Sequence, residues 1–289
     1  MHLCLPIAHL CHSAAVKKSQ HAVDALWALG LLGQPPSEGT LKVLLARLAA
    51  DASKLQPGQL SAIVWSLQRM GAEHLCPQEL KRPLEALKLP FSVHQRLLPA
   101  SWSNVESIMQ EVEFRRDEIR LGEGGVEKVL EESRLTAWQS CTGLSFSYSG
   151  KTMAPQPMTP TVIKLREALA EHTGQLYDGV LINLYMTPSV GMRFHQDPGQ
   201  GEEWTEETAV VSVGETRQFV MRRVDDHADR HVFYVSSGDC VRMFGACQRD
   251  WQHCVKVEGG AAAAGGGPRV SFVFKQSMAH AGGLSEVGP

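Results

Sequence analysis

The chain has 289 residues, of which 43% are apolar and 20% charged, and its formal net charge is −3. This length suffices for one large domain or two small ones. The balanced charge excludes a strongly basic protein that coats nucleic acid by bulk attraction, and no apolar run reaches the roughly 18 residues that a membrane-spanning helix needs. We therefore expect a globular protein without a membrane partner.

The cysteines and the N-terminus indicate the compartment. The seven cysteines are odd in number and form no C-x-x-C pair, so neither a disulfide framework nor a cysteine-rich zinc site is expected. The N-terminus lacks the charged, apolar and cleavage regions of a signal peptide. Both features favour an intracellular location, with the nucleus and an organelle (chloroplast or mitochondrion) left open.

Residues 1–90 are expected to form a small α-helical repeat segment. Apolar residues recur there at helical spacing in two stretches: Leu41, Leu44, Leu45 and Leu48, then Leu60, Ile63, Val64 and Leu67. Two similar stretches around Trp27 and Trp65 indicate a repeat and resemble the octotricopeptide-type repeats of algal organelle RNA-binding proteins. Two ordinary amphipathic hairpins are the alternative. The chain begins within what looks like a repeat, so we expect its N-terminus to be truncated.

Residues 91–289 are expected to form a second, β-rich domain. A helix is predicted near 162–172, ending at Gly174. Many short strands separated by turn residues are typical of a sandwich or barrel. The predicted strands are 180–185, 209–213, 218–224, 232–235, 240–244, 251–257 and 270–275.

A histidine and an aspartate two positions apart are the focal motif. On a strand, residues i and i+2 share a face, so His195 and Asp197 would converge on one point. His253, in an apolar strand-like context, would complete a two-histidine, one-carboxylate triad of the kind that binds Fe(II) and leaves positions open. His227 and His231 lie among acidic residues and are interpreted as a solvated hairpin turn.

Two further polar sets suit an anionic co-substrate. Arg269, Ser271 and Lys275 share one strand face, whose alternative interpretation is a solvated basic edge. Inside a barrel such a row needs an anion, and the planar fork of arginine suits a carboxylate. Asn183 and Tyr185 add hydrogen-bonding groups on another strand. With the triad, these residues match the requirements of an Fe(II)/2-oxoglutarate dioxygenase.

Over residues 101–276 the sequence resembles the AlkB family of nucleic-acid dealkylating dioxygenases. The R-L-T-A-W and Y-S-G-K-T blocks resemble its eukaryotic DNA and RNA repair branch. The matching blocks are 134–138, 148–153, 155–157, 183–185, 195–197, 212–219, 238–239, 248–253 and 269–274.

The resemblance implies an α+β protein with a double-stranded β-helix (jelly-roll) core preceded by the helical segment. Fe(II) would be held by His195, Asp197 and His253, with O2 as the second co-substrate. 2-Oxoglutarate would be held by Arg269, Asn183, Tyr185, Lys275 and Ser271. Lys275 stands where the family usually has a second arginine, which keeps the charge but loses the fork.

The resemblance also implies a nucleotide-recognition lid around 134–157. Its candidate substrate residues are Arg134, Trp138, Tyr148, Ser149 and Lys151, with core packing as the alternative for Trp138. The implied reaction is oxidative demethylation of N-methylated bases in DNA or RNA, of the 1-methyladenine and 3-methylcytosine type, with release of formaldehyde, succinate and CO2. A monomer is expected. The alternatives are a hydroxylase of a protein or small molecule, and an RNA-binding repeat protein with an impaired catalytic module.

Overall fold

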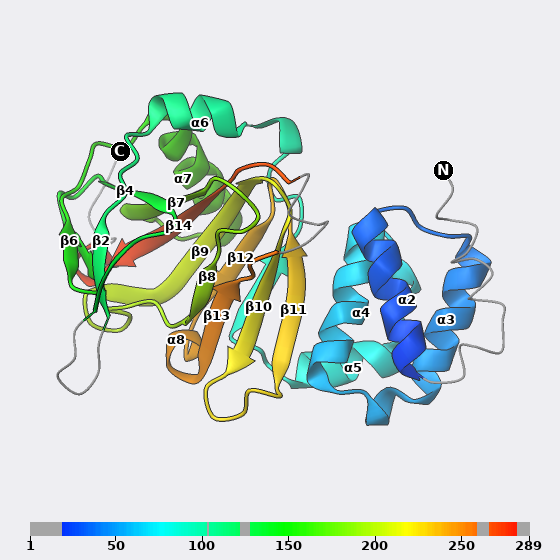
Figure 1. The fold of residues 1–289 in the computed structure, drawn as a ribbon. Coiled ribbons are helices and arrows are strands. Elements are labelled where there is room, and N and C mark those ends of the chain that lie inside the picture. Colours follow the sequence, from blue (N-terminus) through cyan, green and yellow to red (C-terminus); the bar gives the residue numbers. More distant parts are fainter. Residues whose placement is uncertain (1–18, 103, 122–127, 259–265, 282–289) are drawn as a thin grey trace. The chain divides into compact units, whose positions relative to one another are not determined.

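The chain divides into two compact units (Figure 1). The computed structural model describes residues 19–102, 104–121, 128–258 and 266–281, so the start of the chain, where truncation is expected, lies outside the described residues. The first unit combines residues 1–89 with residues 220–234, and the second combines residues 90–219 with residues 235–289. The domain boundary expected at residue 90 stays a prediction, and the assignment of residues 220–234 to the helical unit was not foreseen.

Local signals define the helices of the first unit. Ser37 caps its helix by accepting a hydrogen bond from the amide of Thr40 (3.2 Å), and Gly71 ends another in the left-handed region at φ +67°, as C-terminal glycines commonly do. The helices are α2 (Ser19–Leu32), α3 (Glu38–Ala50), α4 (Pro57–Met70) and α5 (Gln78–Ala86), with single turns at Ala52–Lys54 and Glu73–Leu75.

The helices of this unit share one apolar core. It includes the predicted leucines of α3 and the α4 residues Leu60, Ile63 and Leu67, all nearly fully buried. Gly30 in α2 faces α4 so closely that a Cβ atom there would lie 2.9 Å from the Cα of Ser66. The α2–α4 contact therefore requires a glycine at this position.

The second unit contains the jelly-roll core. A six-stranded sheet has the order β1-β12-β9-β14-β7-β4, and a four-stranded sheet has the order β11-β10-β13-β8, with β11 and the outer part of β10 contributing to the first unit. The strands of the larger sheet are β1 (Phe91–His94), β4 (Leu135–Ser140), β7 (Gly179–Tyr185), β9 (Trp204–Gly214), β12 (Cys240–Met243) and β14 (Arg269–Ser277). Those of the smaller sheet are β8 (Met192–His195), β10 (Arg217–Arg223), β11 (Arg230–Val235) and β13 (Trp251–Val255).

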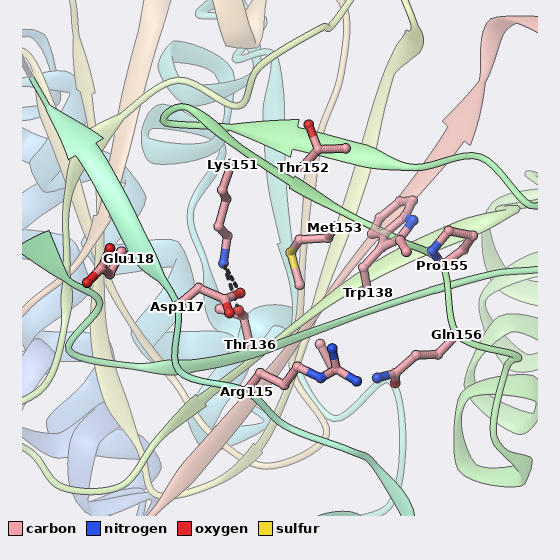
Figure 2. A pocket seen from close by; sticks show the side chains of 12 residues that line it. Arg115, Asp117, Glu118, Thr136, Trp138, Lys151, Thr152, Met153, Pro155 and Gln156 are labelled. Carbon is pink, nitrogen blue, oxygen red and sulfur yellow. Dashed lines mark hydrogen bonds and ion pairs between the residues drawn. The ribbon is translucent and has the colours of Figure 1, made fainter. Parts of the chain in front are cut away.

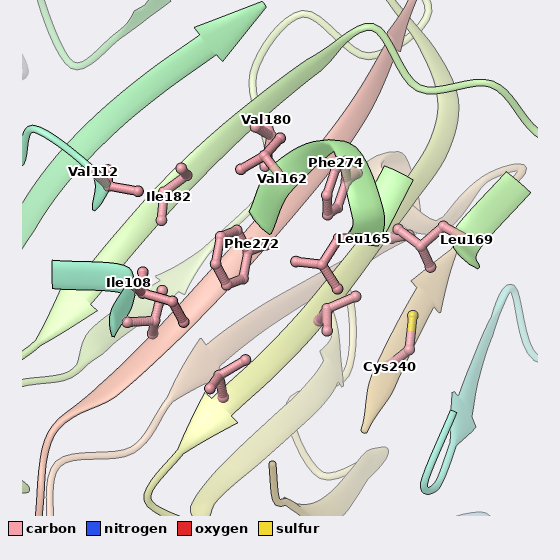
Figure 3. Packing of buried hydrophobic residues seen from close by; sticks show 14 of the residues in the cluster. Ile108, Val112, Val162, Leu165, Leu169, Val180, Ile182, Cys240, Phe272 and Phe274 are labelled. Carbon is pink, nitrogen blue, oxygen red and sulfur yellow. The ribbon is translucent and has the colours of Figure 1, made fainter. Parts of the chain in front are cut away.

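Two helices pack on the outer face of the larger sheet. They are α6 (Val105–Glu111) and α7 (Pro160–Thr173). Leu165 and Leu169 of α7 pack with Phe272 and Phe274 of β14 in a fully buried cluster (Figure 3). Each such side chain contributes ~1.5–3 kcal/mol through burial, so this layer holds the sheet rigid behind the site.

The inner face of the larger sheet carries polar residues. In β14 the even-numbered residues 270, 272 and 274 pack in the apolar cluster beneath the helices. Since neighbouring strand residues point to opposite faces, Arg269, Ser271 and Lys275 point to the inner face of the sheet. Arg269 pairs with Tyr185 of β7 across the ladder, and Ser271 pairs with Asn183. The register therefore places both predicted polar sets on one face.

Further short elements complete the described part of the chain. They are the hairpins β2 (Glu118–Leu121) with β3 (Lys128–Glu131) and β5 (Phe146–Tyr148) with β6 (Lys151–Met153), a turn at Ala100–Trp102, and the helices α8 (Cys247–Asp250) and α9 (Met278–Ala281). The α+β class with an antiparallel jelly-roll core and N-terminal helices is confirmed. None of the helices in the described ranges combines the length and apolar character that crossing a membrane requires.

Candidate metal and co-substrate site

Three possible metal ligands converge between the two sheets. His195 ends β8 and lies directly across from His253 on the antiparallel strand β13. Their ring centroids are 4.2 Å apart, and Asp197 Oδ1 lies 3.5 Å from His195 Nε2 and 3.6 Å from His253 Nε2. One ligand atom from each residue lies within 4.8 Å of the others, which is the spacing of a single-ion site.

The charge states of the three residues suit a divalent cation. Burial raises the pKa of Asp197, but Lys275 and the two imidazoles outweigh this effect and hold it well below its usual range, so the carboxylate is ionised. Burial, aided by His195, lowers the pKa of His253 to about 3. A neutral imidazole and an ionised carboxylate are the forms that bind metals.

The orientation of His195 also fits a metal. Its Nδ1 lies 2.9 Å from the carbonyl oxygen of Arg193, which can only accept, so Nδ1 carries the proton. The lone pair of Nε2 is then free on the side that faces Asp197, as is typical of metal-binding histidines. Two imidazole nitrogens and one carboxylate oxygen form the donor set that non-haem Fe(II) prefers.

The strand expected across the H-x-D motif ends two residues before Asp197, which the shared-face argument needs within the strand. β8 stops at His195, and Asp197 lies in the turn that follows. The Asp197 amide donates to Gln248 Oε1 (2.8 Å) rather than to a strand neighbour, and Gly199 continues the turn at φ +70°. Asp197 therefore reaches the site through a side-chain hydrogen bond and not through strand periodicity.

A buried arginine marks the end of the same cavity. Arg269 is fully buried, donates from Nη2 to Ser212 Oγ (2.8 Å), and lies over the ring of Tyr185 at 5.3 Å. Among the described residues its Nε and Nη1 have no hydrogen-bond partner. Since a buried unpaired guanidinium is costly, this geometry suits a carboxylate of a bound ligand. The cavity is lined by Leu181, Asn183, Tyr185, Met192, His195, Asp197, Val210, Phe219, His253, Val255, Arg269, Ser271 and Val273.

Lys275 lies at the metal end of the site. Its side chain is 1% exposed, and its Nζ lies 2.9 Å from Asp197 Oδ2. The ammonium group thus neutralises the carboxylate of a candidate metal ligand. Its assignment to the co-substrate stays a prediction.

The lid residues form a charged cluster around a carboxylate that the sequence analysis missed. The Glu132 side chain is fully buried and accepts hydrogen bonds from Tyr148 (2.9 Å to Oε1) and Lys151 (2.6 Å to Oε2), while Arg134 Nη2 lies 3.0 Å from its Oε1. Lys151 also binds Asp117 (2.9 Å), as Figure 2 shows beside a pocket at the β4 edge. The pair Glu131–Glu132 resembles a solvated acidic run, so no sequence signal singled out Glu132.

This cluster is linked to the co-substrate strands. Arg134 Nε donates to Asn183 Oδ1 (2.8 Å), and Asn183 Nδ2 lies 3.4 Å from Ser271 Oγ. Three predicted residues with two different assigned roles therefore form one hydrogen-bonded chain. Arg134 therefore connects the lid cluster to the co-substrate strands.

Of the candidate substrate residues, Trp138 lies in a buried strand and Ser149 lies in a turn. Trp138 belongs to β4, is 1% exposed, and stacks on Phe146 with ring centroids 4.8 Å apart, which favours the packing alternative. Ser149 lies in the two-residue β5–β6 turn at φ +46°, followed by Gly150 at φ +76°. The segment expected as a lid thus begins as a strand of the main sheet, and only its hairpin projects from it.

The comparisons with known proteins agree with this geometry. The model of the 2OG-Fe(II) oxygenase superfamily matches residues 95–275. An uncharacterised protein of Acanthamoeba polyphaga mimivirus is 33% identical over 51% of this chain and 74% of its own length. The alpha-ketoglutarate-dependent dioxygenase alkB homolog 3 of Bos taurus is 31% identical over 50% of this chain and 52% of its own, and the DNA oxidative demethylase ALKBH2 of Bos taurus is 29% identical over 47% and 50%.

The matches to the two bovine AlkB homologues span about half of their length. The solved structure of OsALKBH1 aligns with a TM-score of 0.43 at 17% identity, over 65% of this chain and 99% of that one.

Proposed function

Because this chain belongs to the 2OG-Fe(II) oxygenase superfamily, in which its sequence is AlkB-like, we propose that it removes N-methyl groups from bases in DNA or RNA. Enzymes of this superfamily use Fe(II), 2-oxoglutarate and O2. The proposed substrates are bases of the 1-methyladenine and 3-methylcytosine type. The proposal includes a monomer and an intracellular location, in the nucleus or in an organelle.

The chemistry divides between the cofactor and the chain. Ferrous iron with 2-oxoglutarate and O2 supplies an oxidant that hydroxylates the N-methyl group; formaldehyde then leaves the base, and the co-substrate becomes succinate and CO2. His195, Asp197 and His253 would hold the iron, and the free donors of Arg269 would bind the distal carboxylate. A base must leave its stack to reach this cavity, so the lid hairpin would hold it there.

The observation that carries the proposal is the combination of the triad with the lid hairpin. The metal-binding triad alone does not indicate which substrate a member of the superfamily oxidises. The β5–β6 hairpin follows the R-L-T-A-W block and carries Tyr148 in the Y-S-G-K-T block, and a fully buried carboxylate, Glu132, anchors it. Similarity to relatives named as alkB homologues and as a DNA oxidative demethylase supports the same substrate class.

The test is incubation of the full chain with Fe(II), 2-oxoglutarate and single-stranded oligonucleotides that each carry one methylated base. DNA and RNA versions of 1-methyladenine and 3-methylcytosine are compared, with unmethylated oligonucleotides and His195→Ala as controls. We expect a mass loss of one methylene from at least one substrate, matched by succinate. Succinate without demethylation would refute the nucleobase proposal and favour a hydroxylase of another substrate. Neither product from a metal-loaded chain would favour the RNA-binding alternative.

A further inference from the structure

Arg217 is a fully buried cation that the sequence analysis left without a role. It is the first residue of β10, with 0% of its surface exposed. Its Nη1 donates to the carbonyl of Pro188 (2.8 Å), and its Nη2 donates to Thr187 (2.6 Å) and more weakly to Val190 (3.4 Å). One guanidinium therefore binds three carbonyls of a single short segment.

That segment connects the two halves of the site. β7 ends at Tyr185, which lines the cavity together with Asn183, and β8 begins at Met192 and ends at the candidate ligand His195. Residues 186–191 are the only covalent link between them. β7 is also held by its ladder with β14 and β8 by its ladder with β13, and this link joins the two.

The charge of Arg217 is not neutralised by direct contact. Its hydrogen bonds to Pro188, Thr187 and Val190 all go to neutral carbonyls, and among the described residues its Nε has no partner. Burial lowers its pKa, while Glu258 and Glu215 act on it only from a distance. Placing a buried guanidinium here is costly, which indicates that the conformation of the segment matters.

Arg217 and Arg269 make different kinds of contact. Burial and, to a lesser extent, the charge of Arg217 lower the pKa of Arg269. Arg269 lies over the Tyr185 ring and has donors to spare, whereas the two Nη atoms of Arg217 are used by the main chain. Arg269 therefore faces the cavity, whereas Arg217 holds residues 187–190, which follow the cavity residue Tyr185.

We propose that Arg217 is a positioning residue for 2-oxoglutarate, acting by holding residues 187–190 so that Tyr185 and His195 face the same cavity. This role concerns the co-substrate and is independent of which substrate is oxidised. It requires the planar fork, because two nitrogens must reach carbonyls at different positions of the segment. Lysine would keep the charge and lose the geometry.

The experiment compares wild type, Arg217→Gln and Arg217→Lys. Anaerobic titration of the Fe(II)-loaded chain with 2-oxoglutarate, followed by the visible charge-transfer band of the chelate, measures the Kd. Succinate formation gives KM and kcat. We expect the Kd and KM for 2-oxoglutarate to rise about tenfold or more in Arg217→Gln, with a smaller rise in Arg217→Lys and little change in kcat. Arg223→Gln is the matched control, because it alters a half-buried arginine at the end of β10 that pairs with Asp225.

A merely structural role would lower the midpoint of unfolding and leave the Kd of the folded protein unchanged, and that result overturns the proposal. Hydrogen exchange on the wild type provides a test that needs no variant. The amides of residues 186, 187 and 189–191 should exchange more slowly once 2-oxoglutarate binds. Unchanged exchange in this segment also overturns the proposal.

Discussion

Gln196 and Gln248 join the same two segments, because the Gln196 side chain binds the main chain of Gln248 and the Gln248 side chain binds the main chain next to Gln196. The Gln196 side-chain nitrogen donates to the carbonyls of Gln248 (2.7 Å) and Arg249 (2.9 Å), while Gln248 Oε1 accepts from the amide of Asp197 (2.8 Å). The segment after His195 is thereby joined to α8, directly before the strand that carries His253. The β8–β13 ladder places His195 opposite His253, and this reciprocal contact fixes the amide of Asp197 beside them.

Removing half of this contact should weaken metal binding. Gln248→Leu leaves the Asp197 amide without its acceptor, and changes of this kind next to ligands cost about tenfold or more in metal affinity. The measurement is the Kd for Mn²⁺, a redox-inactive probe here, followed by its electron paramagnetic resonance signal. Arg249→Gln is the control, because only the main chain of Arg249 takes part in the contact and its side chain is 76% exposed. Equal Kd values for the two variants would contradict the prediction.

Lys275 should be replaceable by arginine but not by a neutral residue. Its ammonium lies 2.9 Å from Asp197 Oδ2 in a fully buried position. Lys275→Met leaves the carboxylate without its cation, so we expect at least tenfold weaker binding of 2-oxoglutarate to the metal-loaded chain. Lys275→Arg keeps the charge and presents it as a planar fork, so its Kd should stay near that of wild type. Titration of the three proteins checks this, and a wild-type Kd in Lys275→Met would contradict a role for Lys275 in co-substrate binding.

Glu132 should be essential for the stability of the lid. Its buried carboxylate binds Lys151 and Arg134, and removal of one partner of a buried ion pair costs about 3 kcal/mol or more. Glu132→Gln should therefore lower the free energy of unfolding by about that amount and raise the KM for a methylated oligonucleotide. Urea denaturation and steady-state kinetics measure the two effects.

The neighbouring acid provides the control for this prediction. Glu131 is 69% exposed and lies 3.9 Å from Arg116, so Glu131→Gln should change stability by less than about 0.5 kcal/mol. Similar losses in the two variants would show that the buried network has no special role.

The helices, strands and strand faces could be predicted from the sequence because they depend on local periodicity. The buried polar contacts could not, because they join segments that are far apart in the chain. The expected helix near 162–172 is α7 (Pro160–Thr173), and the expected strand 180–185 is β7 (Gly179–Tyr185). Strand periodicity also placed Arg269 and Ser271 on one inner face. These patterns repeat every two or about 3.6 residues, so they can be recognised within a single element.

Contacts between remote segments leave no such pattern. Gln248 lies 51 positions from Asp197, and Glu132 lies 19 positions from Lys151. The acidic neighbours of His231 predict a solvated turn, but the residue lies fully buried in β11, where its Nδ1 is 2.7 Å from Ser61 Oγ, 170 positions away. Which of many polar residues becomes buried is decided by the packing of elements, and that information is not local.

The burial of His231 should make stability depend on pH. Burial lowers its pKa from 6.5 to about 4. Between these values the unfolded chain binds a proton that the folded chain does not, so stability falls as the pH decreases from about 6.5 to about 4. The full effect of this one group is about 3 kcal/mol.

The measurement is urea denaturation at pH 7 and at pH 4 for wild type, His231→Gln and His227→Gln. The glutamine at 231 keeps a hydrogen-bonding group near Ser61 but has no proton to gain, so this variant should lose about 3 kcal/mol less than wild type over the interval. His227 is exposed in the turn before β11, so His227→Gln should follow wild type. Parallel losses in all three proteins would mean that the Ser61–His231 contact opens before the histidine is protonated, because only a histidine that stays buried keeps its lowered pKa.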